Sequence, residues 1–488
     1  MTAQIAEAAG RGNGLENGTE NMAGTVARHV AETSFEALDA GTVARAKIRI
    51  IDSLGNIAAG HRAQGNGAVL DLARRWGGAP ESRVLVHGIR LPAHNAAMVN
   101  AVMMRSYDFE PIGAEYEDQT QSAAHISGTT VPVALAVAEQ QGSSGRDLLT
   151  ALILGDDLTS RLAAASGFDV YSGQDNTGTV NGLGGTAVAA KLMGLDADQV
   201  RNALGIAVNQ LSGTVANIFD QTLAFKLPIA FAARNSIVSA ELAQAGFTGP
   251  ADAIAGPHGF LDMYCASPAP GKVTRGLGRA FYADCVIKPW SSCRASHPSL
   301  DACVRLATEN VLNEDEIEEI LIHVTPRTLK GFVGQPFVIG DCPEVSGAFS
   351  ISFTAATALM YRTVRPEHLT LEHMQDPRLQ RLLDKIRLVD SLPPAESLTA
   401  EVELRLRDGS VLRTRTDVPK GDIYASPMSG TEILDKYYAN AEFGGRIPRR
   451  NAEEAVRLVQ HLEDLDSLAP LIKLFTPDFS ALNPRRMK

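Results

Sequence analysis

Two cationic side chains and a histidine lie close together in the segment IKPWSSCRASHP (287–298). Arg294 can bind a carboxylate through two parallel hydrogen bonds, and Lys288 can bind one as a point charge. This spacing favours capture of a carboxylic acid, although His297 suits equally well a cap on the following helix. Cys293 lies among these cations, which lower a thiol pKa. We expect it to pack rather than to act as a nucleophile.

Three further residues have side chains suited to moving a proton. His125 opens the segment HISGTT, and an imidazole accepts and returns protons near neutral pH. Lys226 lies in AFKLP, where apolar neighbours remove solvent, lower an amine pKa and create a base. Asp108 follows the apolar stretch 96–104 and can orient a histidine or a lysine. Each residue also has a structural alternative. Asp108 can be a surface carboxylate, His125 a structural histidine, and Lys226 a lysine at a helix start whose ammonium reaches solvent.

The first half of the chain is rich in Ala, Leu and Val at helical spacing. In 43–59 the apolar residues recur every three or four positions, and several later stretches are apolar all round, as in buried helices. The glycine-rich NGLGGT (181–186) follows no strand and lacks the spacing of a dinucleotide loop, so it predicts close helix packing. We therefore predict a large helical domain over 24–284, preceded by a disordered tail over 1–23.

The pattern changes in the second half of the chain. Residues 317–324 and 399–406 alternate apolar and polar side chains, which is the strand period. The second of these stretches leads into Asp408-Gly409, which is typical of a hairpin turn. The sequence predicts a smaller α+β domain over 285–424, followed by helices over 425–488 that return to the helical domain. The predicted fold is thus mainly α with an inserted α+β lid.

The overall composition excludes several classes of protein. The 488 residues carry a formal net charge of -11, which argues against a nucleic-acid binder. No apolar stretch approaches the length of a membrane span, so no membrane association is expected. The first residues lack the features of a signal peptide, and the five cysteines form no C-x-x-C pair, so we expect a cytoplasmic location. The cysteine spacing offers no zinc or iron–sulfur site, so no metal is expected.

Eight segments, in order, resemble the MmgE/PrpD family, whose members include 2-methylcitrate dehydratase, cis-aconitate decarboxylase and an iminodisuccinate epimerase. The resemblance implies a helical domain with a smaller α/β lid, a homodimer, a carboxylic-acid substrate and no cofactor. The segments are KIRIIDSLGNIAAG (47–60), SYDFE (106–110), HISGTTVPVALAVAE (125–139), TGTVNGLGGTAVAAKLMGLD (177–196), FKLPIAFAARNSIVSAELAQAGFTGP (225–250), GPHGF (256–260), IKPWSSCRASHPSLDA (287–302) and SPMS (426–429).

The resemblance favours functional roles over the structural alternatives. Asp108 matches the first acid of the family motif DFDDT, and His125 and Lys226 stand at positions that act in catalysis in the family. The chain departs from the motif at Glu110, Pro111 and Ile112, and the threonine hydroxyl lost at Ile112 removes a substrate contact.

The sharpest departure is at Gln174-Asp175-Asn176, where many members carry Trp-His-Pro. Asp175 thus stands where the family has a functional histidine, with Tyr171 nearby. A carboxylate there repels a substrate carboxylate, but it can transfer a proton or bind an amine or hydroxyl. Cys293 stands where the family has paired cysteines or a histidine.

Taken together, these residues predict a lyase of the dehydratase type acting on a small di- or tricarboxylic acid. Lys226 or His125 removes a proton next to a carboxylate, while Lys288 and Arg294 hold carboxylates and spread the developing charge. The alternatives are an epimerase or isomerase, in which Asp175 or Tyr171 is the second base, a decarboxylase, and a catalytically silent relative that binds small acids. The altered motifs argue against methylcitrate itself as the substrate.

Overall fold

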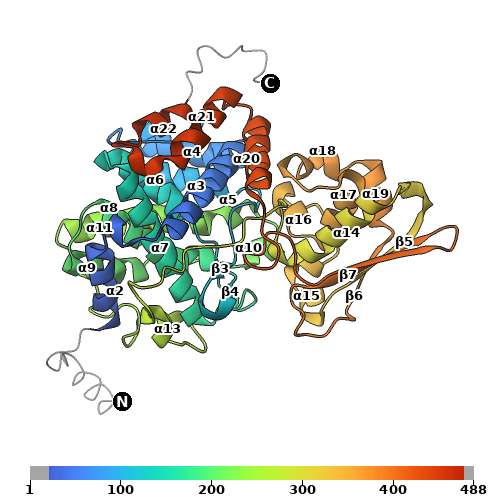
Figure 1. Ribbon diagram of the computed structural model, residues 1–488, viewed down its shortest axis with the longest axis horizontal. Helices are drawn as coiled ribbons and strands as arrows, with labels where there is room; N and C mark the ends of the chain where they lie inside the picture. Colours follow the sequence, from blue (N-terminus) through green and yellow to red (C-terminus); the bar gives the residue numbers. More distant parts are fainter. Residues whose placement is uncertain (1–20, 477–488) are drawn as a thin grey trace.

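The computed structural model describes residues 21–476 and has a large helical body joined to a smaller lobe (Figure 1). The predicted mainly α fold with a small α+β unit is confirmed. Most of the predicted disordered tail over 1–23 lies outside the described residues. Its last two residues are helical, because α2 begins at Met22, where the side chain of Asn21 accepts a hydrogen bond from the Gly24 amide.

The body is a bundle in which several helices are buried on all sides, as their uninterrupted Ala, Val and Leu residues predict. Its long helices are α2 (Met22–Glu32), α3 (Ala40–Gly60), α4 (Asn66–Trp76), α5 (Ala93–Arg105), α6 (Thr130–Gln141), α7 (Gly145–Ser166), α8 (Val180–Leu192), α9 (Ala197–Val208) and α11 (Leu227–Gln244). Its short elements are α10 (Ala216–Phe219), α12 (Phe260–Tyr264), α13 (Gly271–Thr274), β1 (Ser82–Arg83), β2 (Arg90–Leu91), β3 (Ala114–Glu115) and β4 (Gln121–Ser122).

Glycines allow the central helices α7 and α8 to touch through their backbones. A Cβ atom on Gly184 would lie 1.9 Å from Thr159 Oγ1 and 2.6 Å from the Gly155 carbonyl oxygen. Any side chain at Gly184 would therefore push α7 and α8 apart. This contact explains the glycine-rich segment 181–186 as helix packing, as its sequence predicted.

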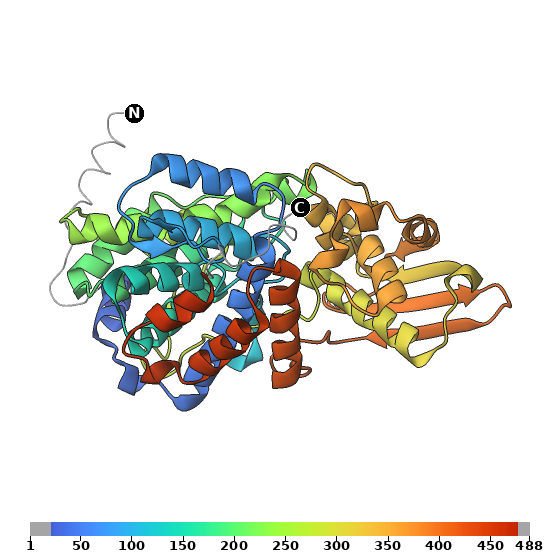
Figure 2. The same cartoon turned by 90° about the horizontal axis from the view of Figure 1, so that it is seen from above.

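The smaller lobe, called the lid, is built on a mixed four-stranded sheet. The strands β5 (Ile317–His323), β6 (Ile386–Val389), β7 (Ala400–Leu406) and β8 (Val411–Thr416) lie in the order β6-β5-β7-β8. Only the β5–β6 pair is parallel, and β7 and β8 form the predicted hairpin. Helices pack against this sheet (Figure 2): α14 (His297–Glu309) and α17 (Ile351–Tyr361), with the short α15 (Pro326–Lys330), α16 (Pro343–Ala348), α18 (Leu371–Met374) and α19 (Pro377–Leu383).

After the lid the chain returns to the body through α20 (Gly430–Gly444), α21 (Arg449–Gln460) and α22 (Ala469–Leu474). Helix α20 packs along α3, where the Lys436 ammonium lies 2.6 Å from the Asp52 carboxylate. The chain path follows the predicted order of body, lid and returning helices, while the boundaries at 284/285 and 424/425 stay predictions. Within residues 21–476, no helix has the length and apolar character needed to cross a membrane.

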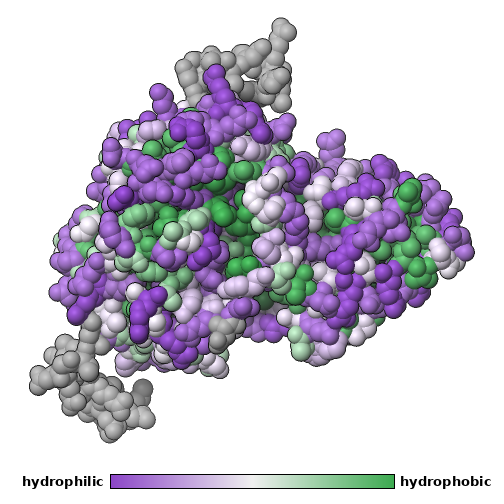
Figure 3. Space-filling view, in the orientation of Figure 1, coloured by the Kyte–Doolittle hydropathy of each residue, from purple (hydrophilic) through white to green (hydrophobic). Residues whose placement is uncertain are grey.

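The outer surface is mostly polar on the face seen in Figure 3, with apolar residues showing near its centre, toward the junction of the two lobes. At this junction the chain crosses from body to lid near residue 290 and returns near residue 420. Side chains from both lobes meet there, and the candidate site lies among them.

Candidate active site

A cavity of about 490 Å3 lies between the body and the lid. Its lining includes Arg105 and Asn176 from the body and Arg327, Phe332 and Phe349 from the lid. The predicted site residues that line it are Asp108, His125, Tyr171, Asp175, Cys293 and Arg294. Three other predicted site residues are absent from the lining: Lys226, Lys288 and His297.

The turn after α5 carries the first group of site residues. Asp108 has a φ of 47°, a left-handed conformation that costs energy for a residue with a side chain. Lys288 holds this turn, because its ammonium donates to the Asp108 backbone carbonyl at 2.7 Å and to Asp108 Oδ2 at 2.9 Å. Lys436 of α20 donates to the next carbonyl, that of Phe109, at 2.8 Å. The structure thus places Lys288 on a protein carboxylate, and its predicted role in holding substrate stays a prediction.

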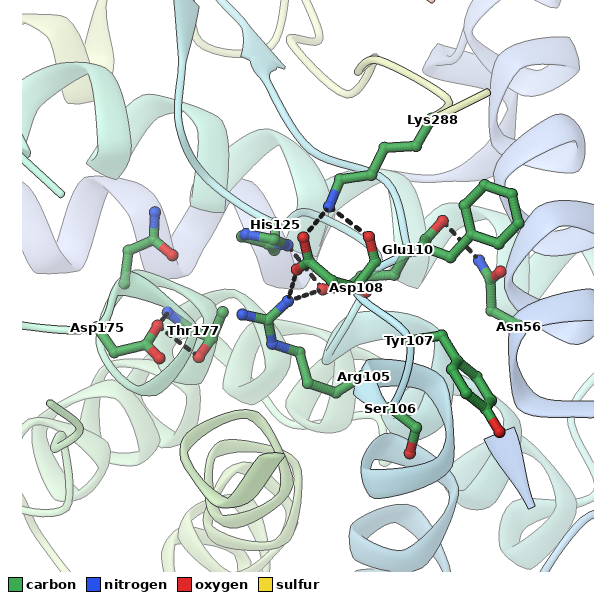
Figure 4. Close-up of polar contacts among 12 residues, drawn as sticks. Asn56, Arg105, Ser106, Tyr107, Asp108, Glu110, His125, Asp175, Thr177 and Lys288 are labelled. Carbon is green, nitrogen blue, oxygen red and sulfur yellow. Dashed lines mark hydrogen bonds and ion pairs between the residues drawn. The ribbon is translucent and has the colours of Figure 1, made fainter. Parts of the chain in front are cut away.

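Arg105, Asp108, Glu110, His125 and Lys288 form a buried cluster that we call the cavity cluster (Figure 4). The Arg105 guanidinium pairs with Asp108 and donates to Glu110 Oε1 at 2.6 Å. His125 Nδ1 lies 2.8 Å from the same Glu110 oxygen. Burial alone would raise the pKa of Glu110, but Arg105 and then His125 hold this pKa well below its ordinary value. Glu110 is therefore an anion that orients the imidazole.

His125 is placed to act as a base on a molecule in the cavity. Burial lowers the pKa of His125, Arg105 lowers it further, and Glu110 offsets part of this decrease. The imidazole is therefore neutral near pH 7. The Glu110 carboxylate beside Nδ1 favours a proton on that nitrogen, which leaves Nε2 with the lone pair. A neutral imidazole in this tautomer accepts a proton through Nε2.

A second buried cluster, the support cluster, holds the turn that carries His125. Its members are Arg49, Ser127, Thr130 and Asp156. Ser127 has a φ of 67°, and its amide donates to Asp156 Oδ1 at 3.1 Å. Thr130 Oγ1 donates to the same oxygen at 2.5 Å, and Arg49 Nε donates to Oδ2 at 3.1 Å. Asp156 thus fixes the start of α6 and, through it, the position of His125.

Asp175 lines the cavity but also has a structural role. It caps a short 3-10 helix (Asn176–Gly178), and its Oδ1 accepts hydrogen bonds from the Thr177 amide at 2.9 Å and the Thr177 hydroxyl at 2.7 Å. These two bonds fix the carboxylate in place. Its predicted role as a second proton-transfer group stays a prediction.

Tyr171 joins the body to the lid at the cavity wall. A Cβ atom on Gly331 would lie 1.8 Å from the Tyr171 hydroxyl, so this close contact requires glycine. The Arg327 guanidinium lies 5.0 Å from the Tyr171 ring centre and pairs with Asp169 of the body. Burial raises the pKa of Tyr171 to about 12, which makes the phenol a poor base near neutral pH.

The segment 293–297 contributes Cys293, Arg294 and Ala295 to the cavity lining. Arg294 donates to the carbonyl oxygens of Lys420 at 2.5 Å and Pro419 at 3.0 Å, and burial lowers its pKa to about 10. Burial raises the pKa of the Cys293 thiol to about 12, so the thiol stays protonated, as expected for packing. His297 is buried beside Arg294, with 3.2 Å between His297 Nδ1 and the guanidinium.

Lys226 lies outside the cavity lining. Its ammonium donates to the Gln64 carbonyl at 2.8 Å and to Asn66 Oδ1 at 3.4 Å. Burial lowers its pKa, as the apolar neighbours predicted, and Glu344 partly offsets the shift. The lowered pKa suits a base, but the position of the amine favours His125 for that role.

Asp108, Glu110 and His125 together have donor atoms of the kind that bind divalent metals, all within 4.8 Å of one another. Both oxygens of Asp108 and Oε1 of Glu110 are, however, already paired with Arg105 or Lys288. A dication there would have to compete with two buried cations. We therefore derive no step through a metal.

Sequence reasoning missed Arg105, Glu110 and Arg327. Glu110 was interpreted only as a departure from the family motif, although a second acid two residues after Asp108 was a signal for a shared cation. Arg105 lies at the end of an apolar helix, where an arginine is naturally interpreted as part of the structure rather than of a site. Arg327 is brought to the cavity by the lid, and no local pattern indicates this position.

The chain matches the MmgE/PrpD N-terminal domain over residues 24–272 and the MmgE/PrpD C-terminal domain over 290–464. It is similar to cis-aconitate decarboxylase of Mus musculus, with 27% identity over 94% of this chain and 93% of the relative. The enzyme of the same name from Homo sapiens is 29% identical over 79% of this chain and 80% of the relative. That of Aspergillus terreus is 24% identical over 94% and 96%. The chain therefore belongs to the MmgE/PrpD family.

Proposed function

We propose that this protein is a lyase that transfers a proton at the carbon next to a carboxylate of a small carboxylic acid, with His125 as the base. The observation that carries the proposal is the pair formed by His125 and the buried Glu110 at a cavity between the two lobes. A neutral imidazole oriented by a carboxylate is a common arrangement for general base catalysis.

In the first step, Nε2 of His125 takes the proton from the α carbon. The electron pair of the broken C–H bond moves toward the substrate carboxylate, and the imidazole becomes a cation beside the Glu110 carboxylate. Glu110 stabilises this cation without taking the proton, because its own pKa is held low. The ion pair is therefore strongest at the stage when His125 carries the extra proton.

Two arginines offer hydrogen bonds for the developing negative charge. The Nε atoms of Arg105 and Arg294 are buried and have no hydrogen-bond partner within the described part of the chain. Both residues line the cavity, so their guanidinium groups place positive charge beside a carboxylate or enolate oxygen bound there.

The bond that breaks next decides the product. In the dehydratase route, the hydroxyl on the neighbouring carbon leaves with a proton as water, and a carbon–carbon double bond forms. In the decarboxylase route no α proton is removed first: a carbon–carbon bond to a carboxylate breaks, carbon dioxide leaves, and the electron pair of that bond stays on the substrate. The substrate carbon then takes one proton from the solvent through His125. The similar proteins from mouse, human and Aspergillus terreus are named cis-aconitate decarboxylases, which supports the second route as an alternative. A homodimer without a cofactor is proposed from the family resemblance alone.

The test is proton NMR in deuterated water with a panel of di- and tricarboxylic acids. We expect deuterium to appear at an α carbon with the native protein and with Lys226→Met, and to be lost with His125→Asn. The product spectrum separates dehydration, decarboxylation and epimerisation. Exchange that survives in His125→Asn but not in Lys226→Met would move the base to Lys226, and no exchange with an acid that binds would contradict the proposal.

A further inference from the structure

The charges around the cavity are already balanced by the protein itself. Asp108 and Glu110 pair with Arg105 and Lys288, and the exposed Arg327 pairs with Asp169 across the mouth. Arg294 and Asp175 are the remaining charged residues of the lining, one of each sign. The four cations are therefore matched by four carboxylates, while His125 is neutral. Each carboxylate of a ligand that enters this buried space adds a negative charge, and the protein cations there are already paired.

One side of the cavity is apolar and comes from both lobes. We call this surface the apolar wall; it consists of Phe168, Val170, Ile218, Phe332, Phe349 and Leu398. Phe332 of the lid contacts Phe349 at 5.6 Å and Tyr171 of the body at 5.4 Å between ring centres. This aromatic surface extends across the junction of body and lid. It offers no hydrogen bonds to a polar ligand, but it favours an apolar group.

The unpartnered polar atoms belong to other lining residues. Among the described residues of the lining, the buried side-chain atoms without a hydrogen-bond partner are Arg105 Nε, Arg294 Nε and His125 Nδ1, and Oε2 of the adjacent Glu110 joins them. A ligand that satisfies both kinds of surface has a compact polar head and an apolar body. A tricarboxylic acid, which is polar at every end, would leave the apolar wall without a partner.

We infer that the substrate is an acid with at most two carboxylates and an apolar substituent of several carbons that packs on the apolar wall. The inference rests on the proposed function for the position of the reacting head. It differs from that function in naming the substrate class: an alkyl-substituted acid rather than an unsubstituted tricarboxylate. The polar head lies beside His125 and the arginines, and the substituent extends toward the lid.

The test measures binding, so it does not depend on turnover. Isothermal titration calorimetry of the full chain compares succinate with 2-methyl-, 2-propyl- and 2-hexylsuccinate, and uses tricarballylate as the tricarboxylic reference. We expect Kd to fall about fourfold for each added methylene until the wall is covered. A Kd that is flat or rises along the series, or tightest binding of tricarballylate, would overturn the inference.

Two variants test the position of the substituent. Leu398 is 39% exposed, so Leu398→Ser should fold normally. It should weaken binding of the hexyl compound about tenfold and binding of succinate much less, because it removes apolar surface without adding a charge. Val311→Ser is the matched control, because Val311 is a fully exposed lid residue that does not line the cavity. An unchanged ratio of the two affinities in Leu398→Ser would overturn the placement on the wall.

This inference and the proposed function can fail separately. If binding depends on chain length but no acid exchanges deuterium, the proposed proton transfer fails and the substrate class stands. If unsubstituted tricarboxylates are turned over and the alkyl series is flat, the proposed function stands and the substrate class is wrong.

Discussion

The cavity cluster and the support cluster each pair a buried arginine with a buried carboxylate, but they differ in their access to the cavity. Each holds a turn in which a residue other than glycine has a positive φ, Asp108 in one and Ser127 in the other. Asp156 of the support cluster accepts from neighbouring backbone and side chains and does not line the cavity. Glu110 of the cavity cluster instead contacts an imidazole that does line it. The difference indicates that the support cluster fixes geometry, and it agrees with the proposal that the cavity cluster performs the chemistry.

The largest expected effect comes from removing the support cluster's carboxylate. Asp156→Asn removes the nearest counter-ion of the buried Arg49 and leaves it with Asp284 at 4.0 Å, and loss of one partner from a buried pair costs about 3–5 kcal/mol. We expect the free energy of unfolding, measured by urea denaturation followed by circular dichroism, to fall by this amount. Activity should fall as well, because the turn that carries His125 loses its support.

The matched control for this prediction is Asp71→Asn. Asp71 belongs to an exposed pair with Arg74, at 3.6 Å, and such pairs contribute little to stability. Equal stability of Asp156→Asn and Asp71→Asn would show that the support cluster does not hold the turn.

Removal of the negative charge of Glu110 from the cavity cluster should affect the rate of the reaction more than the stability of the fold. Glu110→Gln keeps the size of the side chain but removes the anion that stabilises the imidazolium. We expect kcat to fall about 100-fold or more, measured by deuterium incorporation at saturating acid. Glu110→Asp, which keeps the charge, should restore part of the rate. If Gln and Asp at this position behave alike, the role of Glu110 is structural rather than electrostatic.

The same pair of residues predicts the pH dependence of the reaction. The pKa of His125 is lowered, so the base is fully deprotonated at pH 7 and kcat/KM should fall only when the pH drops below about 6.5. Glu110 raises the pKa of His125, and Glu110→Gln should therefore move the acid limb to still lower pH. A shift to higher pH would contradict the proposed ion pair.

The sequence predicted the fold better than it predicted which side chains contact one another within the site. Alternation of apolar and polar residues identified β5 and β7, and the turn signal at Asp408-Gly409 identified the hairpin with β8. The strand β6, with only the four residues IRLV, is too short to show a period. Asp108 and His125 were predicted and do line the cavity. The pairing of Lys288 with Asp108 joins positions 180 residues apart, so no local pattern predicts which carboxylate this lysine meets.

Lys226 shows why spacing and neighbours are not enough. Its apolar neighbours correctly indicated burial and a lowered pKa, but those properties are shared by a catalytic lysine and by a lysine that donates to a backbone carbonyl. Tertiary contacts decide between the two. Glu110 shows the opposite case, because a residue that departs from the family motif became the partner of the base only when Arg105 and His125 were brought beside it.

The smallest expected effect is at Cys293, which lines the cavity close to both Lys288 and Asp108 without belonging to either cluster. Burial raises the thiol pKa to about 12, and the nearby Asp108 disfavours a thiolate further. The thiol is therefore not a nucleophile near pH 7, and Cys293→Ser should keep kcat within about twofold because the substituted atom is similar in size. Rapid alkylation of Cys293 by iodoacetamide at pH 7, measured by mass spectrometry, would show that the cavity stabilises negative charge more strongly than its balanced ion pairs indicate.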